Sequence, residues 1–196
     1  MNVRDAQQDL RSAYVGGGPG VIVSGLVWLA AGLVEQTQGI QTAFIVLFLG
    51  GMLIFPLTTL VVKFGFKRAK ATAGNPLGAT VMESTVAMIG GLVVAWLFLP
   101  YQPEWVFPAA AIAVGTHYAV FKTVYGDPIF WLLAGLITAV GFLGIFADLP
   151  LPGGPILAVA AIEIVFGLLL TLRGVGAPMR GSVTEQQQGG SVGDPN

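Results

Sequence analysis

The chain has 196 residues, of which 55% are hydrophobic and only 10% are charged, with a formal net charge of −1 and a mean hydropathy of +0.80. A soluble domain carries about 25% charged residues, so this chain has too little polar surface for water to be its main solvent. The absence of cysteine excludes a disulfide-stapled scaffold, and a near-neutral chain without a basic stripe is not typical of a nucleic-acid binder.

Apolar runs in the sequence predict an all-α, polytopic membrane protein. A helix needs about 20 apolar residues to cross a hydrocarbon core of roughly 30 Å. Six runs approach that length, at residues 14–34, 41–62, 76–99, 105–121, 128–146 and 153–172. None shows the period-two alternation of a membrane β-barrel. We therefore predict a six-transmembrane-helix bundle over residues 1–173, followed by a disordered cytoplasmic tail over residues 174–196, which is rich in Gly, Gln and Ser.

The basic residues predict the orientation of this bundle. All nine lie on one side of the predicted spans: Arg4, Arg11, Lys63, Lys67, Arg68, Lys70, Lys122, Arg173 and Arg180. The three loops of the other side carry Glu35, Glu104 and Asp148 and no basic residue. By the positive-inside rule both termini are cytoplasmic, in an inner (plasma) membrane. We expect the first run to be retained as a span, because its removal as a signal peptide would leave an odd number of crossings.

The first candidate site residues lie in the first run. Ser24, Trp28 and Ala31 share one face at helical spacing. A tryptophan among small residues fits either the wall of a cavity or the core of the bundle, and the sequence leaves both open.

Two glutamates within the apolar runs are the sharpest signals of a site. A charge at the bilayer centre costs about 2.5–3.5 kcal/mol even on a lenient scale, so such residues are functional candidates. Glu83 shares a helical face with Thr80, Ala87 and Gly90, a face expected to pack against other helices. Glu163 lies near mid-depth in the last run. The functional interpretation is a protonatable coupling site, and the structural one is a neutral, hydrogen-bonded acid that holds helices together.

His117, the single histidine, lies late in the fourth run at a depth comparable to that of Glu83. A Glu83–His117 pair is therefore allowed, with a proton relay as its functional interpretation and an ordinary interface hydrogen bond as the alternative. No ligand spacing supports a metal site. The sequence also lacks the Gly-x-Ser-x-Gly elbow, the His-Glu-x-x-His motif and a cysteine nucleophile. We therefore expect neither an enzyme nor a cofactor.

Six spans also divide into two groups of three, which would point in opposite directions as in inverted-repeat transporters. The third run opens with Pro76 and reaches Glu83 after seven residues, whereas the sixth opens with Pro155 and reaches Glu163 after eight. Chance agreement in a glycine-rich chain explains this match equally well, so the repeat stays an open alternative.

Three stretches resemble an uncharacterised family of small bacterial six-helix membrane proteins: Ser24 to Trp28, Gly50 to Pro56, and Asn75 to Leu77 followed by Glu83. The resemblance runs from about Leu10 to Arg173 and implies a location but no activity. From the residues we predict a small secondary transporter, in which protons or a small solute reach Glu83, Glu163 and His117. The alternatives are a non-transporting bundle that acts through self-association or a membrane partner, and an intramembrane enzyme acting on lipid. That enzyme requires Glu83 within about 3.2 Å of His117 or one bridging water.

Overall fold

The computed structural model describes residues 1–147 and 153–176, and all regular structure in these ranges is helical. The six main helices are α1 (Val3–Ala13), α2 (Gly18–Leu60), α3 (Leu77–Trp96), α4 (Val106–Tyr125), α5 (Ile129–Phe146) and α6 (Gly154–Val175). Three short helical turns are η1 (Val15–Gly17), η2 (Val61–Gly65) and η3 (Pro103–Trp105). The first two predicted runs lie on α2, and the other four lie on α3 to α6. The last 20 residues of the predicted tail lie outside the described residues.

Helix α2 is a hairpin of two antiparallel legs. Its 43 residues are interrupted at Gly39, where φ is 79° and ψ is 173°, a conformation that is essentially restricted to glycine. The first leg is residues 18–38 and the second leg is residues 40–60. A Cβ atom at Gly50 would lie 2.6 Å from Val27, and one at Gly20 would lie 3.6 Å from Thr58. These two approaches show that the legs pack side by side along their length.

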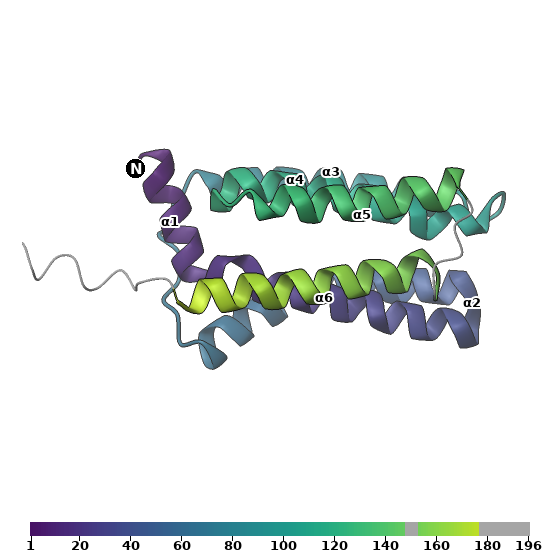
Figure 1. The fold of residues 1–196 in the computed structure, drawn as a ribbon, viewed down its shortest axis with the longest axis horizontal. Helices are drawn as coiled ribbons and strands as arrows, with labels where there is room; N and C mark the ends of the chain where they lie inside the picture. The colour runs from purple at the N-terminus through teal and green to yellow at the C-terminus, as the bar shows by residue number, and fades with distance from the viewer. Residues whose placement is uncertain (148–152, 177–196) are drawn as a thin grey trace, which may run out of the picture.

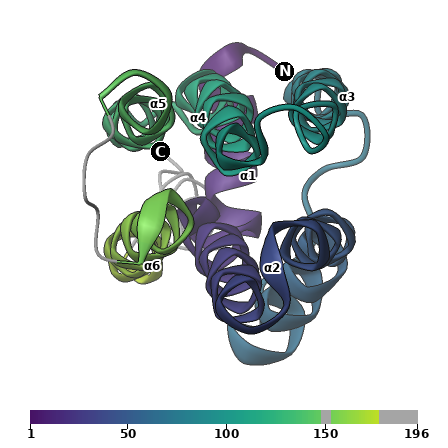
Figure 2. The same cartoon turned by 90° about the vertical axis from the view of Figure 1, so that its right-hand side faces the viewer.

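The long helices form two layers (Figure 1). One layer holds α3, α4 and α5, and the other holds α6 and the two legs of α2 (Figure 2). Glycines allow the closest approaches within each layer. A Cβ at Gly25 of the first leg would lie 3.0 Å from the backbone nitrogen of Ile164 on α6. A Cβ at Gly141 of α5 would lie 3.0 Å from the backbone nitrogen of Ile112 on α4. Small residues at such positions are the usual device for packing helices in a membrane.

Helix α1 lies across one end of the bundle rather than along it (Figure 1). Asn2 caps its start by accepting a hydrogen bond from the backbone of Asp5 at 2.9 Å. The buried Asp9 carboxylate accepts bonds from the backbone nitrogen and hydroxyl of Thr72, both at 2.9 Å, and from Asn75 Nδ2 at 3.0 Å. Since Gln7 Nε2 also donates to the Thr123 carbonyl at 2.8 Å, α1 ties the α2–α3 connection to the end of α4.

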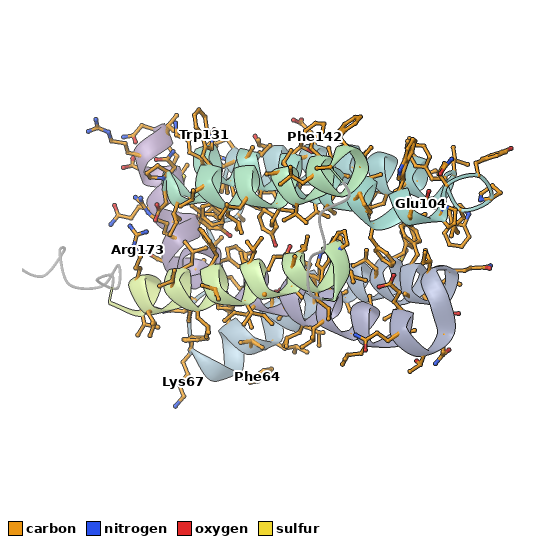
Figure 3. The ribbon with its side chains drawn as sticks, turned by 45° about the vertical axis from the view of Figure 1, so that its right-hand side comes forward. Phe64, Lys67, Glu104, Trp131, Phe142 and Arg173 are labelled. Atoms are coloured by element: carbon orange, nitrogen blue, oxygen red, sulfur yellow. The ribbon has the colours of Figure 1, made fainter. Side chains whose placement is uncertain are left out.

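The basic residues gather at the end of the bundle that carries α1. Figure 3 places Lys67 and Arg173 at this end and Glu104 at the opposite one. Arg173 pairs with Asp127 at 3.2 Å, and Arg68 Nη2 donates to the Gly174 carbonyl at 3.3 Å. We call this end the basic end.

Among the described residues, four helical segments are long and apolar enough to cross a membrane: Val15–Gly65, α3, α5 and α6. Large apolar side chains cover the outside of the bundle. Trp131 and Phe142 point outward in Figure 3 and are 63% and 49% exposed. This surface suggests a membrane protein, because lipid is the solvent that tolerates it.

Helix α4 is not among the four segments, although it is as long as α3. It is the central helix of its layer, and eleven of its residues are buried, against three on α3. A helix that faces protein rather than lipid has less need of apolar side chains, which accounts for its lower hydropathy.

Candidate functional site

A cavity of about 220 Å³ lies between both legs of α2, helix α3 and helix α4. Most of its wall is apolar. The polar side chains of its central part are Ser24 and Thr58 from α2, Thr85 from α3, and His117 and Tyr118 from α4. No Asp, Glu, Lys or Arg of the described chain lines it. The cavity therefore offers hydroxyl and imidazole groups but no direct counter-charge.

Aromatic side chains close the cavity toward the basic end. Tyr125 stacks on Phe130 with ring centroids 5.3 Å apart, and Phe121 stacks on Tyr125 at 5.7 Å. These three rings and Tyr14 all line the cavity. The rings of Tyr125 and Phe130 lie against Gly17, where a side chain would meet the Tyr125 ring, so the glycine makes room for this closure.

A second aromatic cluster lies toward the opposite end. Trp28 lines the cavity and packs on Phe107 with centroids 6.3 Å apart. Phe44 lies 6.4 Å from Phe107 and 5.2 Å from Trp96. The cavity thus lies between two aromatic clusters along the axis of the bundle.

His117 forms a hydrogen bond with Ser84. Its Nδ1 atom lies 3.0 Å from Ser84 Oγ, and the Ser84 hydroxyl also donates to the Val81 carbonyl at 3.0 Å. Because a hydroxyl has one hydrogen, we assign the Nδ1–H tautomer to His117, which leaves Nε2 as an acceptor. The edge of its ring packs on Phe121 at 4.8 Å.

Glu163 lies directly behind the cavity wall. Its side chain on α6 is 0% exposed, and neither carboxyl oxygen has a hydrogen-bond partner of regular geometry in the part of the chain that the structure describes. The hydroxyls of Ser24 and Tyr118 are within interaction range of the carboxyl. A buried acid with incomplete partners is costly, and such groups concentrate at functional sites.

The structure brings together four of the six predicted site residues. Ser24, Trp28 and His117 line the cavity, and Glu163 lies behind it. Thr80 and Glu83 do not line it.

The face of α3 that carries Glu83 is unpacked. Glu83, Ala87 and Gly90 are all exposed, so the expectation that this face packs against other helices of the chain is wrong. Helix α3 instead turns Leu92 and Ala95 toward its neighbours. Among residues 1–147 and 153–176, no hydrogen bond or ion pair joins Glu83 to His117, whose partner is Ser84. Direct hydrogen bonding between Glu83 and His117, one of the two arrangements that the lipid-acting enzyme was expected to need, is therefore not found among the described residues.

Sequence reasoning missed Thr58, Ser84, Thr85 and Tyr118. The most informative of these is Thr58, which is 7% exposed and whose hydroxyl has no partner among the described residues. Gly51, Ile54 and Thr58 share one face at helical spacing and all three line the cavity, but in an apolar run this spacing alone does not single the face out. In the same ranges no group of three His, Asp or Glu residues is arranged to hold a metal ion.

A family model described as DUF7010, a family of unknown function, matches residues 3–173. No curated protein and no solved structure matches the chain.

Proposed function

Since the chain belongs to DUF7010, a family of unknown function, we propose its function from its own site. The protein is a small permease-like membrane protein that binds a small, mainly apolar solute in the cavity between α2, α3 and α4. Glu163 is the protonatable group that couples binding to protons.

One observation carries this proposal. A carboxyl group with incomplete hydrogen bonding is fully buried beside a cavity, behind the hydroxyls of Ser24 and Tyr118. Intramembrane ionisable residues that face a cavity mark substrate and proton pathways in transporters. The aromatic clusters at the two ends of the cavity would then be the gates of an occluded state.

The orientation belongs to the same proposal. The two legs of α2 and helices α3 to α6 would make six crossings, with the basic end and both termini in the cytoplasm. The inverted repeat remains a prediction. Its two glutamates have different surroundings, because Glu83 is exposed and Glu163 is fully buried.

The test uses the absence of native cysteine. Thr58→Cys places a thiol at the cavity wall, and Thr59→Cys is a matched control, because Thr59 does not line the cavity. An impermeant thiol reagent is added from each side of oriented membranes. We expect Thr58→Cys to react from both sides and Thr59→Cys to stay unreactive.

Glu163→Gln is then combined with Thr58→Cys. Glutamine cannot release a proton, so the ratio of labelling rates in the two backgrounds should change with pH if Glu163 controls access. Labelling of Thr58→Cys from neither side, in a folded protein, would contradict the permease.

A second candidate function is assembly without transport, which Glu83 favours. Its side chain is exposed on a helix of membrane-crossing length, and contact with a second copy would remove it from lipid. Ala87→Cys lies on the same exposed face and tests this candidate. A disulfide-linked dimer from Ala87→Cys in native membranes, but not from the exposed Leu168→Cys on α6, would support it.

A further inference from the structure

We propose that the solute is a neutral, single-chain amphiphile that reaches the cavity sideways from the lipid, through the gap between the second leg of α2 and helix α3. This inference rests on the proposed function and names the class of molecule that the same site takes.

A second cavity marks the route. It measures about 290 Å³ and is lined entirely by apolar side chains of the second leg and α3: Phe44, Ile45, Phe48, Leu49, Leu92, Val93 and Trp96. Leu92 also lines the first cavity, so the two spaces are neighbours. Leu49 and Val93 are 55% and 49% exposed, which places the outer space at the lipid-facing surface.

The gap itself follows from how α3 packs. Figure 2 shows α3 facing the second leg of α2 on the same side of the molecule, yet α3 packs against α4 and makes few contacts with α2. Two adjacent glycines of the second leg show that this leg packs against the first leg but not against α3. A Cβ at Gly50 would meet Val27 at 2.6 Å, whereas a Cβ at Gly51 would meet nothing within 4 Å. Gly51 lines the first cavity, so the open space beside it is the cavity itself.

The axial routes are less accessible than this lateral one. The rings of Tyr125 and Phe130 stand at the basic end, and Trp28 with Phe107 stands at the other. A molecule dissolved in the bilayer would meet the gap between the second leg and α3 without passing either of these ring pairs. On this lateral route it would meet only Phe44 and Trp96 of the second cluster, which line the outer cavity.

The lining selects the chemistry of the head group. No charged side chain of the described chain lines either cavity, and an unpaired charge in such a place is strongly unfavourable. Thr58 presents a buried hydroxyl without a hydrogen-bond partner in the described part of the chain, and Ser24, Thr85 and His117 add further polar groups to the same wall. A neutral head with a hydroxyl group would both donate to and accept from these residues, while its alkyl chain would lie in the outer, apolar space.

The experiment uses the full chain in phosphatidylcholine nanodiscs and three photoactivatable probes with the same alkyl chain. One is a primary alcohol, one a carboxylate and one a trimethylammonium. We expect saturable cross-linking of the alcohol to residues 40–60 and 77–96, competed by unlabelled alcohol, and weaker cross-linking of the two charged probes.

Gly51→Leu fills part of the first cavity and should lower alcohol labelling by about tenfold, a loss of about 1.4 kcal/mol in binding. Gly135→Leu is the matched control, because Gly135 on α5 also has nothing within 4 Å and lines neither cavity. Equal labelling by all three probes, preference for a charged probe, or insensitivity to Gly51→Leu would overturn the inference.

The thiol experiment separates this inference from the proposed function. If Thr58→Cys reacts from both sides but the alcohol does not cross-link saturably, the proposed permease function is supported and the proposal of an amphiphilic solute is wrong. If Gly51→Leu lowers cross-linking of the alcohol while Thr58→Cys stays unreactive, binding of the amphiphile is supported and the proposed transport function is wrong.

Discussion

The Nδ1 atom of His117 on α4 lies 3.0 Å from the Oγ atom of Ser84 on α3, and this bond ties an outer helix to the central one. Only three residues of α3 are buried, so this polar contact adds to a limited buried interface. The same bond fixes the orientation of an imidazole that lines the cavity. The position of α3 and the polarity of the site are therefore coupled through one pair of side chains.

Ser84→Ala removes that bond and leaves the His117 donor without its partner. Membrane hydrogen bonds are modest, so we expect a loss of about 1 kcal/mol in the free energy of unfolding, measured in mixed micelles. Thr80→Ala is the control, because Thr80 lies one turn earlier on α3 and is half-buried like Ser84, but among the described residues it forms no hydrogen bond to another helix. Its effect should stay within about 0.5 kcal/mol. Equal losses from both variants would show that the His117 bond contributes nothing.

The depth of residues along each helix could be predicted from the sequence, whereas their direction around the helix could not. Counting residues allowed a Glu83–His117 pair at comparable depth without predicting that the two helices touch, and the structure pairs His117 with the neighbouring Ser84. One residue is about 100° around a helix, enough to exchange a cavity wall for the outer surface. Because every run is apolar on most sides, the sequence holds no strong signal for which face turns inward.

The positions of the helices along the chain could also be predicted from the sequence. Runs of about 20 apolar residues follow from the thickness of a bilayer, and each run lies on a helix in the structure. The position of the cavity, by contrast, depends on which helices lie apart. Gly50 and Gly51 are identical neighbours in the sequence, yet a Cβ at Gly50 would contact Val27 and a Cβ at Gly51 would face the cavity. The pairing of the first leg with α6 was equally hidden, because it brings together residues far apart in the chain.

Gly25→Ala tests that pairing. A Cβ at this position would lie 2.8 Å from Ile164 Cγ1, 3.0 Å from its backbone nitrogen and 3.1 Å from the Ala160 carbonyl oxygen. Backbone atoms cannot rotate away, so we expect a loss of about 1–3 kcal/mol in unfolding free energy, as for other overpacked interiors. Gly90→Ala on the open face of α3 is the control and should be neutral or slightly stabilising. A harmless Gly25→Ala would mean that the first leg and α6 are farther apart than described.

Asp9→Ala tests the attachment of α1 at the basic end. The carboxylate is 5% exposed and accepts three hydrogen bonds from Thr72 and Asn75. Its removal takes away a buried acceptor of three hydrogen bonds, so we expect a loss of about 2–3 kcal/mol and faster hydrogen exchange at the Thr72 amide, which donates to the carboxylate. Asp9→Asn keeps one acceptor oxygen and should fall between the wild type and Asp9→Ala. Gln8→Ala, on the exposed side of α1, should change neither measurement.

Gly39→Ala tests the hairpin that makes two legs of α2. With φ at 79° and ψ at 173°, Gly39 adopts a conformation that costs other residues about 1–3 kcal/mol. A Cβ there would touch nothing within 4 Å, so the whole penalty comes from the backbone. Gly51→Ala is equally open but helical, and we expect no loss from it. In the pair Val27→Cys with Gly50→Cys, a disulfide reports that the legs adjoin, and adding Gly39→Ala should reduce its yield. An unchanged yield together with unchanged stability would show that the chain reverses without help from this glycine.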